Sequence, residues 1–203
     1  MKIYITKGCE NSETSRRFRT AYPGADIKLI EDSESARQEL FASESQSEKR
    51  NIFITRAKGA HFKVCPGTEK PYLCCYYWTL HQSTNCPYDC SYCILQYYLN
   101  NPLLTVFANL DELTDMVRER IREEPQRLFR VGTGELADSL ALDHISLAGP
   151  ELIRFTARQT NMILELKTKS ANVDHLTEIK HKGKTVISWS LNPPSVISGH
   201  EFR

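Results

Sequence analysis

The sequence predicts an α/β protein in which a small α/β unit precedes part of a (β/α) barrel. Residues 1–56 alternate strand, helix, strand, helix, strand, an order that builds a parallel sheet with right-handed crossovers. From residue 76 the alternation resumes on a larger scale, as in a (β/α) barrel. A content of 40% hydrophobic and 25% charged residues is typical of a folded soluble protein.

Turn and capping residues place the elements of the small unit. The polar run at 11–14 can cap a helix, and Pro23-Gly24 ends that helix. The expected strands are 3–7, 26–30 and 51–55, and the expected helices are 11–22 and 32–41.

Glycine and proline make residues 57–75 an irregular connector, and the partial barrel follows over 76–203. Its expected strands are 76–81, 127–131, 162–166 and 185–191. One helix is expected to begin at Asn109, two more are expected at 148–159 and 173–181, and a helix or turn is expected at 97–99. About four βα units cannot close an eight-stranded barrel and leave a parallel strand at the edge. We therefore expect either another chain to cover that edge or the natural polypeptide to continue beyond Arg203.

The charge and hydropathy patterns exclude several classes of protein. A formal net charge of +1 gives no general attraction to nucleic acid or to membranes, although a local patch can still bind. No apolar stretch is long enough to span a bilayer, and Lys7 and Glu10 interrupt any signal-peptide core. We expect a cytoplasmic, reducing location and no membrane partner.

Cysteine spacing indicates metal chemistry. Cys86, Cys90 and Cys93 lie within eight residues, a spacing that suits a metal better than long-range disulfides. Three thiolates can bind three irons of a [4Fe–4S] cluster and leave the fourth iron open, and the amino and carboxylate groups of S-adenosylmethionine can chelate such an iron. A zinc site that joins Cys90 and Cys93 to Cys74 and Cys75, or to His81, is the alternative, although a second matched pair of ligands is missing.

The stretch Cys-X3-Cys-X2-Cys, with Tyr92 just before its last cysteine, resembles the signature of the radical S-adenosylmethionine (radical SAM) enzymes. Several segments narrow the resemblance to the spore photoproduct lyase family. They are Cys65-Pro66-Gly67-Thr68, Tyr72-Leu73-Cys74-Cys75, Cys86 to Gln96, Thr168-Lys169, Ala171 to His175 and Ser188 to Pro193. The resemblance implies a radical SAM-type barrel and an enzyme that uses the adenosyl radical to split a methylene-bridged thymine dimer in DNA.

The resemblance also implies contacts with S-adenosylmethionine at strand ends. The family has a segment whose backbone contacts the methionyl amine, and it is resembled here by Gly132-Thr133-Gly134-Glu135. Lys169 and Ser190 match family positions that make polar contacts with S-adenosylmethionine, and Tyr92 matches a position that contacts its adenine. From the residues alone, the glycine segment can equally be a plain turn, Lys169 a solvated surface lysine and Ser190 a hydrogen-bonded strand hydroxyl.

Two departures separate the chain from its relatives. Gly132 stands where the resemblance places a hydrogen-donating cysteine, and Ile94 replaces a tyrosine that follows the third cluster cysteine. The loop 136–143 also looks longer. The sequence therefore predicts radical generation but does not predict repair of the dimer. It also does not identify the residue that donates the hydrogen atom.

Three functions stay open at this stage. The leading hypothesis is a lyase-like radical SAM enzyme acting on damaged or modified DNA, and the second is such an enzyme acting on another molecule. The third is a non-catalytic iron–sulfur or zinc module. The enzyme hypotheses imply a flavodoxin- or ferredoxin-like electron donor, with DNA as a further partner.

Overall fold

The computed structural model describes residues 1–32, 34–36, 38, 49, 51–67, 73–99 and 101–202. The chain forms two compact units, each built from separate stretches of sequence. Unit 1 combines residues 1–56 with 83–108 and the segment from residue 191 onward, and unit 2 combines residues 57–82 with 109–190. The expected α/β class is confirmed by parallel sheets in both units. The first stretch of unit 1 ends at residue 56, where the sequence predicted a boundary, and residues 83–108 join this unit because Leu104–Phe107 pairs with Ile52–Thr55.

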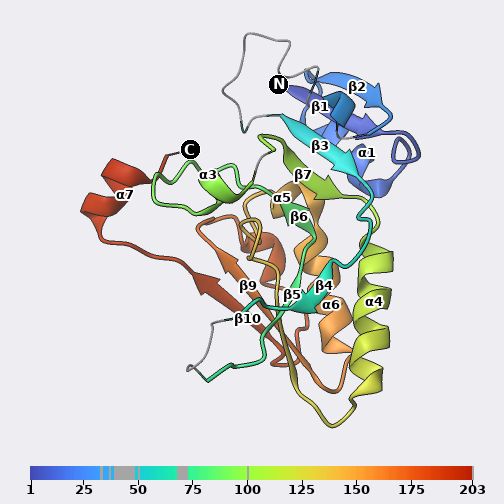
Figure 1. The fold of residues 1–203 in the computed structure, drawn as a ribbon, viewed down its shortest axis with the longest axis vertical. Coiled ribbons are helices and arrows are strands. Elements are labelled where there is room, and N and C mark those ends of the chain that lie inside the picture. The colour runs from blue at the N-terminus through green and yellow to red at the C-terminus, as the bar shows by residue number, and fades with distance from the viewer. Residues whose placement is uncertain are drawn as a thin grey trace. The chain divides into compact units, whose positions relative to one another are not determined.

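Unit 1 is a five-stranded sheet in the order β2-β1-β3-β7-β6 (Figure 1). Its strands are β1 (Lys2–Thr6), β2 (Asp26–Ile30), β3 (Ile52–Thr55), β6 (Ser83–Thr84) and β7 (Leu104–Phe107). Strand β1 pairs in parallel with β2 and with β3, and β3 pairs in parallel with β7. Strand β6 runs antiparallel to β7. The parallel sheet expected for residues 1–56 is therefore present, extended by two strands from beyond the connector.

Local sequence explains the helices of unit 1. Helix α1 (Glu13–Ala21) begins after Ser12, whose hydroxyl accepts a hydrogen bond from the backbone N–H of Ser15 at 3.1 Å. Phe18 is the fully buried apolar side chain of this helix, and Ile3, Ile5 and Ile54 are fully buried in the strands. Two further short helices, α3 (Leu95–Tyr98) and α7 (Pro194–His200), belong to this unit.

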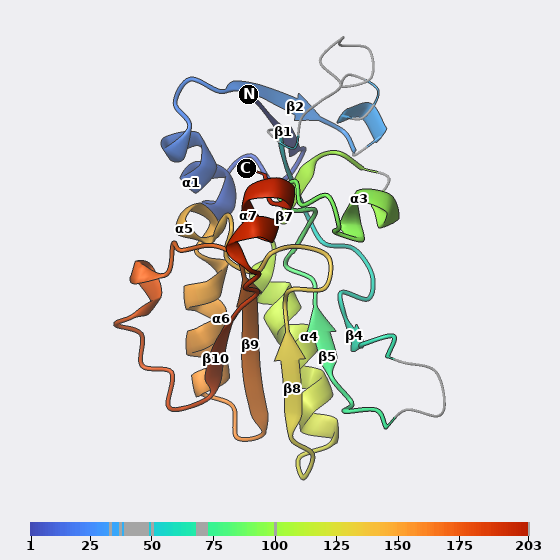
Figure 2. The same ribbon diagram turned by 90° about the vertical axis from the view of Figure 1, so that its left-hand side faces the viewer.

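Unit 2 is a five-stranded sheet in the order β10-β9-β8-β5-β4 (Figure 2). Its strands are β4 (Phe62–Val64), β5 (Trp78–Leu80), β8 (Phe129–Gly132), β9 (Met162–Thr168) and β10 (Thr185–Trp189). The four strands from β5 to β10 are mutually parallel and β4 is antiparallel. The four strands expected after residue 76 are confirmed, and β10 lies at an edge of the sheet as anticipated.

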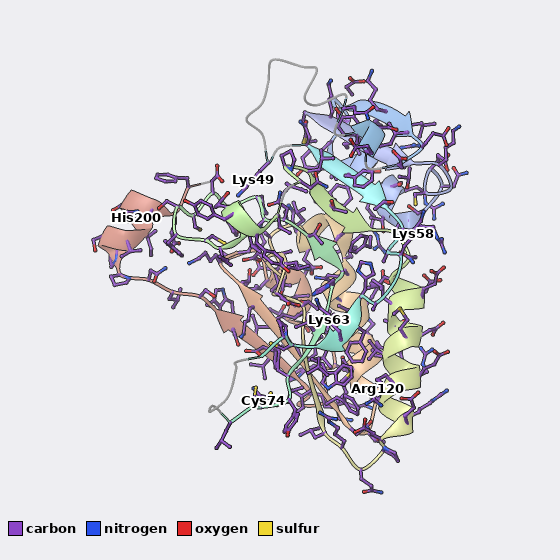
Figure 3. The ribbon with its side chains drawn as sticks, in the orientation of Figure 1. Lys49, Lys58, Lys63, Cys74, Arg120 and His200 are labelled. Atoms are coloured by element: carbon purple, nitrogen blue, oxygen red, sulfur yellow. The ribbon has the colours of Figure 1, made fainter. Side chains whose placement is uncertain are left out.

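Helices cover one face of the unit 2 sheet, where α4 (Leu110–Glu123) and α6 (Ala148–Ala157) lie behind the strands in Figure 2. Arg120 of α4, labelled in Figure 3, lies over the ring of Trp78 at 5.1 Å, on the same face as buried Phe129. Along β9, Leu164 and Leu166 are buried while the alternate positions are not. The face opposite to the helices is therefore the polar face of this sheet.

Two sequence predictions in unit 2 are wrong. The supposedly irregular connector contains β4, which pairs with β5. Instead of a helix over 173–181, only a 3₁₀ helix at Asp174–Leu176 forms. The apolar residues Val173, Leu176 and Ile179 repeat every three positions, and the backbone N–H groups of Leu176 and Ile179 bond three residues back. That spacing fits 3₁₀ turns better than an α-helix.

Several elements had no counterpart in the sequence analysis: strands β6 and β7, helix α7 and the short helix α5 (Asp143–Ser146). Part of the helix expected at 32–41 lies outside the described residues, as do Thr68 and Tyr72 of the resemblance. Among the described residues, no helix combines the length and apolar character needed to cross a bilayer.

The burial pattern of unit 2 gives a stability prediction. Leu164→Ala removes a fully buried side chain from the middle of β9 and is expected to lower the free energy of unfolding by about 2–5 kcal/mol. The matched variant Leu128→Ala, at a side chain that is 55% exposed, is expected to change it by less than about 0.5 kcal/mol. Urea unfolding followed by circular dichroism measures both, and equal losses would contradict the assigned core.

Candidate functional site

The cysteine loop of unit 1 is fixed at its base. It leaves β6 and returns to β7, and these strands pair through Ser83 with Val106 and Thr84 with Thr105. Asn85 then adopts a left-handed conformation with φ 70°, which asparagine tolerates better than most residues. Its amide nitrogen donates to the carbonyl of Asn101 at 2.9 Å. Both ends of the loop are therefore tied together next to its first cysteine.

The three predicted cluster ligands lie in this loop. Cys86 and Cys90 are buried and Cys93 is partly exposed, and all seven cysteines of the chain are thiols rather than disulfides. The N–H of Cys86 donates to the Asn85 side chain at 2.8 Å, and the N–H of Cys93 donates to the carbonyl of Cys90 at 3.0 Å. Short local bonds thus shape the backbone around each thiol.

The donor chemistry of the loop fits an iron–sulfur cluster, because soft thiolates are the ligands that such clusters take. Within the part of the chain that the structure describes, no three His, Cys, Asp or Glu side chains already converge on a metal-sized position. A cluster does not require such convergence, because each of its thiolate ligands binds a different iron.

The end of the chain lies against the cysteine loop within unit 1. The N–H of Asp89 donates to the carbonyl of Phe202 at 2.8 Å, and the N–H of Ser91 donates to the carbonyl of His200 at 2.9 Å. The Ser91 hydroxyl also lies 2.9 Å from Nδ1 of His200, the labelled residue of α7 in Figure 3. These bonds flank the second cysteine, Cys90, on both sides.

The predicted adenine contact, Tyr92, is also bonded to the end of the chain. Its hydroxyl donates to the carboxylate of Glu201 and accepts from the amide of Asn192 at 2.8 Å. Asn192 also donates to Glu201 at 2.6 Å. The Tyr92 hydroxyl therefore has protein partners here, while 51% of the residue remains exposed.

A salt bridge anchors the loop between its first two cysteines. The ammonium of Lys49 lies 2.8 Å from Asp89, whose other donor is the amide of Gln96 at 3.0 Å. The hydrogen bond and charge of Lys49 lower the pKa of the Asp89 carboxyl. Sequence reasoning missed both Asn85 and Lys49, because their partners are distant in sequence.

The predicted methionyl-binding segment lies at the end of β8 in unit 2. A Cβ atom at Gly134 would lie 3.1 Å from Cβ of Lys167 and 3.3 Å from Oγ of Ser139, so glycine permits a close approach of two backbone segments. Buried Thr133 donates to the same Ser139 hydroxyl at 2.8 Å. The segment is thus held rigidly by the loop that follows it.

Glu135 has a different environment from the other residues of its segment. Its Oε2 lies 2.5 Å from Nε2 of buried His81. Burial alone would raise the pKa of Glu135, but hydrogen bonds from His81 and Thr79 outweigh that effect and lower it. The carboxylate is therefore engaged inside the unit rather than presented to a ligand.

The structure brings Lys169 and Ser190 together. The Lys169 ammonium donates to the carbonyl of Ser190 at 2.9 Å, at the neighbouring ends of β9 and β10. Asp138, which the sequence analysis did not single out, accepts from the backbone N–H of Lys169 at 2.6 Å and from the hydroxyl of Thr168 at 2.6 Å. The long loop 136–143 thus supplies the carboxylate that positions Lys169.

Tyr77 occupies the space beside Gly132. A Cβ atom built on Gly132 would lie 1.7 Å from the Tyr77 hydroxyl, so no other residue type fits there without moving that ring. The place that the resemblance gives to a thiol is filled by a phenol from the residue just before β5. The sequence signal was the unusual glycine at a strand end, but nothing in it identified Tyr77 as the occupant.

Comparison with known proteins identifies the family of this chain. The family model described as "Spore photoproduct lyase" matches residues 44–202. Curated proteins named spore photoproduct lyase from Geobacillus sp. and Bacillus subtilis are 32% and 28% identical over 120 residues, which is 59% of this chain and 35% of each relative. The matched region therefore spans about a third of the length of these relatives.

Solved structures show the same fold. A spore photoproduct lyase double mutant with bound AdoMet and dinucleoside spore photoproduct superposes with a TM-score of 0.81 at 21% identity, over 98% of this chain and 58% of that chain. A spore photoproduct lyase complexed with dinucleoside spore photoproduct gives 0.80 at 20% identity over the same shares. Since the family model covers most of the sequence, this chain belongs to the spore photoproduct lyase family of radical SAM proteins.

Proposed function

We propose that this protein binds a [4Fe–4S] cluster through Cys86, Cys90 and Cys93 and cleaves S-adenosylmethionine reductively. The observation that carries the proposal is the three-thiol loop, tied at its base by Asn85, on a chain of the spore photoproduct lyase family. When bound, the cluster would supply the electron that breaks the carbon–sulfur bond of the sulfonium and yields a 5′-deoxyadenosyl radical.

The polypeptide would contribute chelation, orientation and exclusion of water. Closely held backbone at Gly132-Thr133-Gly134-Glu135 suits contacts with the methionyl amine, because glycine brings main-chain groups near a ligand. Lys169 is preset by Asp138 and offers a positive charge beside Ser190, suited to a carboxylate or a ribose hydroxyl. Tyr92 would contact adenine with its exposed ring.

For the substrate we propose damaged or modified DNA. The support is that related solved structures are described with a dinucleoside spore photoproduct. The Tyr77 phenol beside Gly132 favours a second candidate, a radical SAM enzyme of the same family acting on a different molecule. A flavodoxin- or ferredoxin-like protein is the proposed electron donor in both cases.

Removing one cluster thiol tests the cofactor. Cys90→Ala, at a buried cysteine of the loop, is expected to abolish the visible absorbance and most of the bound iron after anaerobic reconstitution, because two thiolates cannot hold the cluster stably. Iron and sulfide analysis with absorption spectroscopy measures the effect.

Cys75→Ala is the matched control, at an exposed cysteine outside the loop, and should keep the full iron content. Loss of metal in both variants, with zinc rather than iron bound in the unmodified protein, would instead support the zinc alternative.

Adding one methyl group tests the methionyl segment. Gly134→Ala places a Cβ against Lys167 and Ser139 and is expected to weaken S-adenosylmethionine binding about tenfold, equivalent to about 1.4 kcal/mol, with the cluster retained. The change that S-adenosylmethionine causes in the electron paramagnetic resonance of the reduced cluster provides the measurement. Gly24→Ala, with open space around its Cβ, should bind normally.

A product assay tests the substrate. Dithionite-reduced protein with S-adenosylmethionine should release 5′-deoxyadenosine, and DNA carrying the methylene-bridged thymine dimer should lose the dimer in a chromatographic assay. Formation of 5′-deoxyadenosine without loss of the dimer would favour the non-nucleic-acid substrate, and absence of both would reject the proposed enzyme.

A further inference from the structure

On the polar face of the unit 2 sheet, the phenol of Tyr77 fills the space that a side chain at Gly132 would occupy. The Tyr77 ring lies so close to Gly132 that an added Cβ would be 1.7 Å from its hydroxyl oxygen and 2.5 Å from Cζ. Tyr76, with φ 52°, turns the chain just before this ring. The absence of a side chain at 132 is therefore what allows the phenol to reach the end of β8.

The residues around this phenol share the face of the sheet that the helices leave uncovered. Gly132 pairs with Glu165 in the β8–β9 register, so both lie on the face opposite to buried Val131 and Leu164. Strand ends on the carboxyl side of parallel sheets are where such folds place their sites. The Tyr77 hydroxyl thus lies beside the carboxyl end of β8, on the face that the helices leave uncovered.

A hydrogen bond fixes the orientation of the Tyr77 hydroxyl. It donates to Oε2 of Glu165 at 2.7 Å, and Oε1 of the same carboxylate accepts from Ser188 at 2.9 Å. Arg130 and Lys167 place their cations 5.7 and 5.4 Å from the ring centroid. Burial, followed by the hydrogen bond with Glu165, raises the pKa of Tyr77 well above its ordinary value, so the O–H bond persists at neutral pH.

We propose that Tyr77 is the hydrogen-atom donor that quenches carbon radicals formed at this site, an inference that rests on the proposed radical function. A carbon radical accepts a hydrogen atom readily from a phenol or a thiol. Thr79, Arg130, Glu165, Lys167 and Ser188 share this face, and their O–H, N–H and C–H bonds are stronger. The thiol of Cys65, whose backbone N–H donates to the carbonyl of Tyr77 at 2.8 Å, is the competing donor, and Cys65→Ala should leave deuterium transfer intact.

The step balances as follows in atoms and electrons. The Tyr77 O–H bond breaks homolytically, its hydrogen atom forms a C–H bond on the substrate radical, and a neutral phenoxyl radical remains. One electron from the low-potential donor that also reduces the cluster, and one proton from solvent, restore the phenol beside Glu165. Each turnover then consumes two electrons and one S-adenosylmethionine.

Deuterium transfer in D₂O tests the donor. The reconstituted, dithionite-reduced protein is given S-adenosylmethionine with or without dinucleoside spore photoproduct. The exchangeable phenol should deliver deuterium to the product, or to 5′-deoxyadenosine when no substrate reacts. Tyr77→Phe keeps the ring against Gly132 but should lose this deuterium and raise the ratio of 5′-deoxyadenosine to product. Freeze-quenched samples with ring-deuterated tyrosine should show a narrowed phenoxyl signal that Tyr77→Phe lacks.

Tyr76→Phe, at a neighbouring tyrosine that is 64% exposed, is the matched control and should retain deuterium transfer. The double variant Tyr77→Ala with Gly132→Cys makes room for a thiol and should recover transfer. Deuterium uptake that is unchanged in Tyr77→Phe overturns the inference while leaving the proposed function intact. Failure of the unmodified protein to form 5′-deoxyadenosine overturns both.

The protein without cofactors gives an independent readout. In an ultraviolet titration, the phenols of Tyr77 and Tyr22 should both ionise at a higher pH than an ordinary tyrosine, and Tyr77→Phe should remove one of these two late transitions. Gly132→Ala should displace the Tyr77 ring and return its phenol toward its ordinary pKa, because burial and the Glu165 hydrogen bond are lost. Loss of a phenol of ordinary pKa in Tyr77→Phe, or a high-pH transition that Gly132→Ala leaves unchanged, would contradict the placement of Tyr77 and so overturn the inference.

Discussion

The tie at Asn85 is the constraint on which the cysteine loop depends. A loop from residue 85 to 103 has many conformations, and presenting three thiols to one cluster requires that most of them be excluded beforehand. Asn85 achieves this by accepting the N–H of Cys86 while donating across the loop to Asn101. The short pairing of β6 with β7 and the bonds from the C-terminal segment restrict the same loop further.

Glycines at the end of β8 perform the corresponding task in unit 2, and they do so by leaving space. Gly134 lets the backbone approach Lys167, and Gly132 lets an aromatic ring approach the strand. The two positions differ in consequence, because the first brings main-chain groups together while the second admits a phenol with its own chemistry.

The local sequence pattern predicted most of the helices and strands. It failed for elements that are stabilised by partners elsewhere in the chain. Strand β4 has three residues and is stabilised by pairing with β5, so its own sequence carries little signal. The run Leu104–Phe107 was rich enough in strand-forming residues to have been recognised as β7. Apolar residues in the 173–181 segment suggested a helix, although their three-residue spacing favours 3₁₀ turns.

The sequence by itself determined the α/β class, the four parallel strands after residue 76 and the thiol motif at Cys86, Cys90 and Cys93. These features follow from periodicity and spacing along neighbouring residues, which a chain carries whatever its fold. Only the tertiary structure decided that Asn85 ties the cysteine loop and that Tyr77 fills the space at Gly132. Each depends on a contact between segments 16 or more positions apart, and strand register rather than local sequence sets such distances.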